Sequence, residues 1–290
     1  MSIAGGLLEA VARAKRLGCT TMQIFSRSPR GGAATKLSPD ELERFDSQRR
    51  AADLEPLAIH GPYIINLASP HATMWKQSVR LYQEEYHRAT LLNAQYLVTH
   101  VGSHRGEGEA AGISRVSQAL NQTLDGQSSS VTILLENTAG SGQGLGVQFE
   151  QLAAIRHGVT KKDQVGMCLD TAHLFAAGYP IHTAEGLEDT VGQFDRVLGL
   201  DQLKLMHLND SKVPFGSRVD RHWHIGQGHI GLEAFRRIVN HRVLSHVPCI
   251  LETPKTTEVD DQRNLRTVTR LIKASHRSRR ERDALACVHE

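Results

Sequence analysis

Metal-binding side chains are concentrated in a polar segment between residues 203 and 230. An apolar run ends at His207, and the loop that follows carries Asp220 and His222. These last two residues are two positions apart, so in an extended segment their side chains point to the same side. A carboxylate and an imidazole placed in this way can ligate one metal ion, but a loop rich in Asp and His is also a common solvated surface. The segment alone leaves both interpretations open.

The ends of the apolar runs that we interpret as β-strands are also rich in metal ligands. Seven strands are expected, one ending at Phe25 and six ending in a histidine or a carboxylate. The six residues are His60, His100, Glu136, Asp170, His207 and Glu252. A lone histidine at a strand end is usually structural, but coincidence does not explain six of seven. In a parallel barrel the carboxyl ends of the strands form the active-site face, so these side chains should meet at one mouth.

The segment Asp170-Thr171-Ala172-His173 adds a further ligand candidate. If the chain turns into a helix there, residues three apart lie on one face and both side chains point into the mouth. The complete set then consists of His60, His100, Glu136, Asp170, His173, His207, Asp220, His222 and Glu252. Neutral imidazole with carboxylate suits Zn²⁺, with Mn²⁺ or Fe²⁺ as alternatives. Nine ligands are too many for one tetrahedral ion and fit three ions that share a bridging carboxylate.

The strands that position these residues alternate with helices. Apolar residues recur at helical spacing from Ala4 to Leu17, and Ser38 followed by Pro39 predicts the start of the next helix. Successive strand ends are 34 to 45 residues apart along the whole chain. Alternation at a nearly constant interval favours an α/β fold of the TIM (β/α)₈ type over an open sheet.

One strand of such a barrel is missing from the sequence. Seven strands are countable where a closed barrel has eight, and one further unit before Phe25 would begin ahead of Met1. We therefore expect the first strand to be absent, with Met1 an internal methionine of a longer gene product or the start of a shortened form. A version extended upstream should be more soluble and more heat-stable, and equal stability would contradict this. Residues 1–274 are expected to form one domain, and residues 275–290 a basic, disordered tail.

The composition favours a soluble, cytoplasmic protein without a membrane partner, and we expect a monomer. With 290 residues, 40% of them hydrophobic, the chain can bury a large core. It shows neither a signal-peptide pattern at its start nor an apolar run long enough to span a bilayer. The four cysteines are scattered and form no C-x-x-C pair, which argues against a disulfide framework or a thiolate zinc site. The net charge of +3 is compatible with a polyanionic partner but does not require one.

Six collinear segments together resemble the endonuclease IV family of apurinic/apyrimidinic (AP) endonucleases. They are HGPYIINLASP from His60, HVGSH from His100, LLENTAGSGQGLG around Glu136, CLDTAHLFAAGYP around Asp170, MHLNDSKVPFGSRVDRHWHIGQGHIG from Met206 and ILETP from Ile250. The resemblance covers nearly the whole chain and implies a TIM barrel that holds three zinc ions. It assigns His60, His100 and Glu136 to the first ion. Glu136 would bridge to the second ion, which Asp170, His207 and Glu252 would also bind, and His173, Asp220 and His222 would hold the third.

The resemblance also implies an activity on double-stranded DNA. The family is a group of phosphodiester hydrolases (deoxyribonuclease IV) that cleave 5′ to an abasic site and leave a 3′-hydroxyl and a 5′-deoxyribose phosphate. It also trims blocked 3′ ends. Glu252 would orient or deprotonate the attacking water, and Glu136 would act beside it as the bridging carboxylate. A hydroxide generated between two zinc ions fits this chemistry, and no covalent protein intermediate is needed.

Two loops match the family's DNA-contacting loops, residues 26–32 and 60–66. They offer Arg30 for charge and Tyr63 and Ile64 for stacking or wedging at the abasic site. The family usually carries Asn-x-Arg-x-Trp in the first loop, where this chain has Ser-Pro-Arg-Gly-Gly from residue 28. This departure affects the expected contacts with DNA and leaves the nine ligands unchanged.

Two other functions are compatible with parts of the pattern. A sugar isomerase or epimerase of the related xylose-isomerase-like barrels also binds divalent metal at strand ends, but with fewer ligands. A non-catalytic zinc-binding or DNA-damage-binding remnant would be expected to have lost at least one ligand. The completeness of the nine-residue set argues against both.

Overall fold

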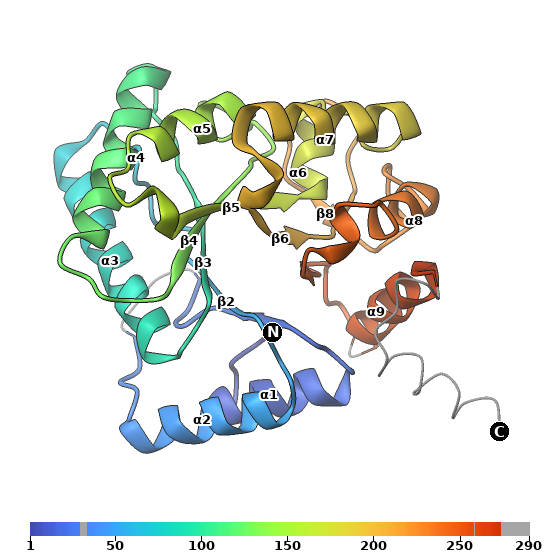
Figure 1. The fold of residues 1–290 in the computed structure, drawn as a ribbon, viewed down its shortest axis with the longest axis horizontal. Helices are drawn as coiled ribbons and strands as arrows, with labels where there is room; N and C mark the ends of the chain where they lie inside the picture. The colour runs from blue at the N-terminus through green and yellow to red at the C-terminus, as the bar shows by residue number, and fades with distance from the viewer. Residues whose placement is uncertain (30–33, 258, 274–290) are drawn as a thin grey trace.

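The computed structural model describes residues 1–29, 34–257 and 259–273, which form a parallel sheet surrounded by helices (Figure 1). Within these residues the sheet has seven strands in the order β1-β2-β3-β4-β5-β6-β9, every neighbouring pair parallel. The strands are β1 (Met22–Ile24), β2 (Leu57–His60), β3 (Tyr96–His100), β4 (Thr132–Glu136), β5 (Val165–Asp170), β6 (Leu203–His207) and β9 (Cys249–Ile250). The expected α/β fold of the TIM type with one strand missing is confirmed.

Helices connect successive strands and cover the outside of the sheet (Figure 1). They are α1 (Leu7–Arg16), α2 (Pro39–Ala51), α3 (Ala72–Leu91), α4 (Glu109–Leu124), α5 (Phe149–His157), α6 (Thr171–Ala177), α7 (Ala184–Leu198), α8 (Leu232–Val239) and α9 (Asp260–Leu271). Short 3₁₀ turns lie at Lys162–Gln164, Leu200–Gln202 and Leu244–His246. A separate two-stranded antiparallel sheet pairs β7 (Asp210–Ser211) with β8 (His222–Trp223). None of the described helices combines the length and hydropathy needed to cross a bilayer.

Two helix starts follow directly from the sequence. The amide of Glu41 donates to Ser38 Oγ at 3.2 Å, and Pro39 occupies the first position of α2. In the same way the amide of His173 donates to Asp170 Oδ1 at 2.8 Å, which begins α6 immediately after β5. The carboxylate that ends a strand therefore also starts the next helix.

A small apolar layer fills the interior of the sheet just below the mouth. It consists of Ala58, Val98, Leu134, Cys168, Leu205 and Ile250, all nearly inaccessible to solvent. Each of these residues stands two positions before one of the six ligand candidates at the strand ends. Because side chains alternate along a strand, residues two apart point to the same side, so the apolar layer and the ligands form successive levels of one interior. A larger cluster packs the other faces of the strands against the helices.

Some boundaries differ from the expectation. The last strand was expected to run to Glu252, but β9 ends at Ile250, and Glu252 lies two residues beyond it. Only two residues of this strand pair with β6, because the chain leaves the ladder after the partner of His207. The expected basic tail at residues 275–290 lies outside the described residues.

Candidate metal centre

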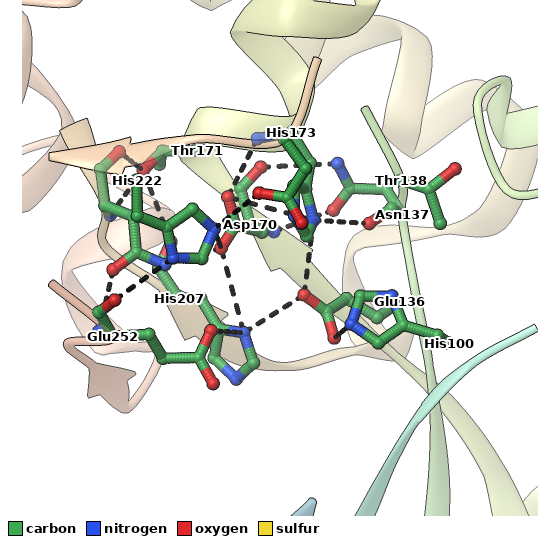
Figure 2. A network of polar contacts seen from close by, with 12 residues as sticks. His100, Glu136, Asn137, Thr138, Asp170, Thr171, His173, His207, His222 and Glu252 are labelled. Carbon is green, nitrogen blue, oxygen red and sulfur yellow. Dashed lines mark hydrogen bonds and ion pairs between the residues drawn. The ribbon is translucent and has the colours of Figure 1, made fainter. Parts of the chain in front are cut away.

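Donor atoms of the strand-end residues converge at one place (Figure 2). The six strand ends and the start of α6 face one another, as expected for the carboxyl ends of parallel strands. Three groups of donor atoms lie close enough to hold an ion each. They are His60, His100 and Glu136; Glu136, Asp170, His207 and Glu252; and Asp170, His173 and His222. Glu136 and Asp170 belong to two groups each, so the three groups are contiguous.

The first group is organised around one oxygen of Glu136. Its Oε2 lies 3.3 Å from His60 Nε2 and 3.5 Å from His100 Nε2. The other ring nitrogen of His60 donates to the main-chain carbonyl of Gly61 at 2.8 Å. A carbonyl can only accept a hydrogen bond, so it places the proton on Nδ1 and leaves the Nε2 lone pair facing Glu136.

The second group is centred on His207. Its Nδ1 lies 3.1 Å from Glu136 Oε1, 3.1 Å from Glu252 Oε2 and 3.8 Å from Asp170 Oδ2. The two oxygens of Glu136 therefore face different groups, a geometry that suits a bridging carboxylate.

The third group adds the residues of α6 and β8. His222 Nε2 lies 3.5 Å from Asp170 Oδ2. Half-exposed Asp220 completes this group from outside, with one oxygen 3.2 Å from His173 Nε2 and the other 3.3 Å from His222 Nε2. All nine ligand candidates thus lie at one site.

Two buried ring nitrogens of the third group, His173 Nε2 and His222 Nε2, lie 3.2 and 3.3 Å from the oxygens of Asp220 but form no aligned hydrogen bond with any described residue. Their opposite nitrogens are engaged, by the carbonyl of Asn137 at 2.9 Å and the carbonyl of Glu252 at 3.1 Å. Buried polar atoms are normally satisfied, so each orphan needs an explanation. A cation bound between these nitrogens and the nearby carboxylates would satisfy both, and this donor set fits zinc.

Neighbouring charges shift the pKa values of the site residues in the direction opposite to the effect of burial. Burial by itself raises the pKa of the Glu136 carboxyl, but the rings of His100 and His207 outweigh it and hold that pKa well below its ordinary value. Burial lowers the pKa of His173, and the carboxylates of Asp170 and Asp220 raise it well above its ordinary value. The pKa of His207 is also raised well above the ordinary value against the effect of burial. In the absence of a metal the carboxylates therefore hold protons on neighbouring rings, and a bound cation would replace those protons.

Several polar residues that hold the ligands escaped the sequence analysis. Asn209 Nδ2 donates to Asp170 Oδ2 at 2.6 Å, and its Oδ1 accepts from the amide of Glu252 at 2.7 Å. The side chain of Asn137 donates to the main-chain carbonyl of Asp170 and accepts from its main-chain amide. Gln23, on β1, contacts two ligands. Each is a buried polar residue on an apolar strand or within two residues of its end, and that was the signal available in the sequence.

The loop with the expected DNA contacts lies beside the first group. Tyr63 and Ile64 are exposed, with 62% and 52% of their surface accessible. The Tyr63 ring is centred 5.6 Å from the ring of His60 and 6.0 Å from that of His100. Its amide donates to the carbonyl of Pro29 at 3.1 Å, which joins the two expected DNA loops. Arg30, the third expected contact, lies outside the described residues.

Comparisons with known proteins agree with this arrangement. A family model described as a xylose isomerase-like TIM barrel matches residues 11–275. The probable endonuclease 4 of Halothermothrix orenii is 42% identical over 255 residues, covering 88% of this chain and 92% of that protein. The crystal structure of endonuclease IV from Thermus thermophilus has a TM-score of 0.83 at 37% identity and covers 93% of this chain and 96% of that one. A D-tagatose 3-epimerase-like protein, with a TM-score of 0.65 at 19% identity over 86% of this chain and 87% of that one, shares the fold alone.

Proposed function

The chain belongs to the endonuclease IV family of xylose isomerase-like TIM barrels, and from this premise we propose that it is a zinc-dependent DNA-repair endonuclease. Its substrate is double-stranded DNA containing an abasic site. It hydrolyses the phosphodiester 5′ to that site, leaves a 3′-hydroxyl and a 5′-deoxyribose phosphate, and trims blocked 3′ ends. One observation carries the proposal: three contiguous groups of donor atoms, two of whose buried ring nitrogens form no aligned hydrogen bond with any described residue.

The proposal assigns three ions per chain to nine ligands. His60, His100 and Glu136 would hold one ion, and Glu136, Asp170, His207 and Glu252 the second. His173, Asp220 and His222 would hold the third, with Asp170 close to both the second and third groups. Zinc bound to such ligands supplies Lewis acidity, which neutralises charge on a phosphate and makes water nucleophilic near neutral pH.

Glu252 is proposed to orient the attacking water and accept its proton. Burial raises the pKa of its carboxyl, but His207 and His60 outweigh burial and hold that pKa far below its ordinary value. Glu252 is therefore an ionised acceptor at neutral pH. Its amide donates to Asn209 and its carbonyl accepts from His222, so its backbone is fixed on both sides of the side chain.

The DNA-binding surface is proposed to include Arg30, Tyr63 and Ile64. Tyr63 is exposed beside the rings of His60 and His100, and Ile64, the next residue, is exposed too; an aromatic and an aliphatic side chain can fill the gap left by a missing base. Replacing Tyr63 and Ile64 together by serine should weaken binding to an abasic duplex while the bound metal is unchanged. If the variant binds the abasic duplex as tightly as the parent protein does, Tyr63 and Ile64 are not part of the DNA-binding surface.

The test of the function combines two measurements on one preparation. Elemental analysis should give close to three zinc ions per chain, and a duplex with one tetrahydrofuran abasic analogue should be cut once, on its 5′ side. The products should carry the 3′-hydroxyl that a polymerase extends directly. An undamaged duplex of the same sequence is the control for specificity.

Two other outcomes would favour the alternative functions. Bound metal without incision, together with interconversion of ketose sugars, would indicate an isomerase or epimerase. Binding to abasic DNA without incision would indicate a non-catalytic remnant.

A further inference from the structure

Gln23, on β1, places a polar side chain at a level of the sheet interior where the neighbouring strand carries an apolar residue. Gln23 pairs in register with Ala58, a member of the apolar interior layer, and only 5% of its surface is exposed. A buried carboxamide needs partners for both its donor and its acceptor. Gln23 finds both partners among the proposed metal ligands.

Each end of the amide meets a different ligand. Gln23 Nε2 donates to Glu252 Oε1 at 2.6 Å, and Gln23 Oε1 lies 2.9 Å from His207 Nε2. An ionised carboxylate can only accept, so the amide nitrogen must face Glu252 and the amide oxygen must face His207. His207 Nε2 therefore carries the ring proton and donates it to Gln23. Once a cation replaces the second ring proton, His207 Nδ1 would present its lone pair to the donor group, which Glu252 Oε2 also faces, 3.1 Å from that nitrogen.

His207 differs in this respect from three other histidines of the centre. His60, His173 and His222 each place Nδ1 against a main-chain carbonyl, which fixes the tautomer through the fold itself. In His207 the outward nitrogen is Nε2, and a side chain takes the place of the carbonyl. The ring orientation of His207 therefore depends on the identity of residue 23.

We infer that Gln23 is a positioning residue of the metal centre, which sets the tautomer of His207 and the orientation of Glu252 with one amide. The inference rests on the proposed function, because it concerns ligands assigned there. Groups that hydrogen-bond to metal ligands typically change metal affinity or activity by about 10–100-fold when they are removed. Gln23 holds two ligands of the same donor group, so its loss should act on the ion bound there.

The two bonds can be separated by substitution. Gln23→Met keeps the approximate shape and removes both bonds, so the affinity for the zinc ion of the group that contains His207 and Glu252 should fall about 10–100-fold. Gln23→Glu keeps an acceptor for His207 but places a second carboxylate against Glu252. Its metal affinity should lie between those of the parent protein and Gln23→Met, while its cleavage rate stays low, since Glu252 is no longer oriented.

Gln151 provides a matched control within the same chain. It is buried to a similar degree, with 7% of its surface exposed, and likewise donates to a carboxylate, Glu109, at 2.8 Å. Its other partners are main-chain amides before α5. Gln151→Met should lower thermal stability but keep the metal affinity of the parent protein.

The experiment measures zinc affinity by competition with a chromophoric chelator, separately from DNA cleavage. The inference is overturned if Gln23→Met binds zinc as tightly as the parent protein, or if Gln151→Met loses as much affinity as Gln23→Met. A parent protein that binds zinc but does not cut DNA would contradict the proposed function, while a selective loss in Gln23→Met would still support this inference. If the parent protein cuts abasic DNA but Gln23→Met binds zinc as tightly as the parent, the proposed function is supported and this inference is contradicted.

A measurement on the unsubstituted protein keeps the inference testable if the variants do not fold. Long-range ¹H–¹⁵N spectra of the zinc-loaded protein distinguish the two histidine tautomers. His207 should appear with its proton on Nε2, opposite to His60, His173 and His222. A proton on Nδ1 of His207 would overturn the inference.

Discussion

At the scale of single residues, this centre is defined by which nitrogen of each histidine faces inward. Carbonyl oxygens fix three rings, an amide oxygen fixes a fourth, and the inward nitrogens then face the carboxylates of Glu136, Asp170, Asp220 and Glu252. Preset ring orientations lower the cost of metal binding, because a ring only has to release the proton on its inward nitrogen and does not have to turn.

The role proposed for Glu252 gives the most direct prediction at this scale. Glu252→Gln keeps the shape and one oxygen but removes the proton acceptor, and general bases contribute about 10²–10⁴-fold to rate. We expect abasic-duplex binding close to that of the parent protein and cleavage reduced by at least about 100-fold. Single-turnover cleavage beside a gel-shift titration measures both quantities. Cleavage that survives within about tenfold of the parent rate would show that another group activates the water.

Raised histidine pKa values predict how metal binding depends on pH. In the metal-free protein the acidic groups around His173 and His207 outweigh burial and raise both pKa values well above 6.5. Below these raised values the rings are protonated, so zinc must displace protons. Affinity should therefore begin to fall at a pH above 6.5, by about tenfold per pH unit for each proton displaced. Chelator competition at a series of pH values measures the slope, and proton release in weak buffer gives an independent count. A zinc affinity that stays constant as the pH falls to the ordinary histidine pKa would contradict the raised pKa values of His173 and His207.

At the scale of elements, the glycine-rich turn that follows β8 is held against β7 by a single carboxylate. Asp210 accepts from its neighbour's amide and from the amides of Gly226, Gly228 and Ile230. A side chain at Gly228 would collide with the carbonyl of Ser211. The tight glycine turn therefore follows from close packing against β7, and it fixes the end of the segment that carries two ligands of the third group.

A buried ion pair fastens the chain after β1 to helix α3. Arg27 and Glu85 are both buried and form a close ion pair, while Arg27 also reaches Glu84 at 3.1 Å. Ser26 Oγ donates to the same Glu85 carboxylate at 2.7 Å and accepts from Arg88 at 2.8 Å. This network positions the start of the first expected DNA loop.

Breaking this pair from one side should destabilise the protein strongly. Arg27→Met leaves the Glu85 carboxylate buried without its cation, which costs about 3–5 kcal/mol. The double variant Arg27→Met/Glu85→Leu removes both charges and should recover much of that loss. The control is the exposed pair of Arg44 and Asp40 on α2, where Arg44→Met should cost less than about 1 kcal/mol. Urea denaturation measures all three variants, and a cost for Arg27→Met no larger than that of the control would contradict the prediction.

At the scale of the whole molecule, the metal centre joins strands from across the sheet. The proposed ligands come from β2, β3, β4, β5, β6, α6, β8, the segment between β7 and β8, and the segment after β9. Within the described residues β1 and β9 are the edges of the sheet, and residues of both line a cavity of about 570 Å³. The contacts between Gln23 on β1 and Glu252 after β9 bridge these edges at the mouth. Bound metal should therefore stabilise the folded structure in addition to its role in the reaction.

Removing the metal should lower the unfolding temperature. An ion present at roughly 1,000 times its dissociation constant contributes about 4 kcal/mol to the folded state. For a chain of this size that corresponds to a shift of roughly 10 °C per ion. Differential scanning calorimetry before and after treatment with a chelator measures the shift, and added zinc should reverse it. An unchanged midpoint after complete removal of zinc would show that the sheet is held together without the centre.

Much of the site could be predicted from the sequence because strand periodicity and strand direction are local properties. Parallel strands bring their carboxyl ends to one face, so His60, His100 and Glu136 had to lie together once the strands were recognised. The spacing of Asp170 and His173 predicted a shared helical face, and α6 begins between them as the local pattern required. The end of the last strand was placed too late, because pairing with β6 decides where β9 stops.

The sequence by itself determined the fold type and the nine residues that face the mouth. Only the tertiary structure decided which ligands share a group, because that depends on the stagger between strands and on the direction of each carboxylate oxygen. It alone placed Asp170 between two donor groups and brought Gln23 within hydrogen-bonding distance of His207 and Glu252. These residues are 184 and 229 positions away from Gln23 in the chain. A glutamine in a short apolar strand gives no local sign of such partners, since only the curvature of the sheet brings the first and last strands together.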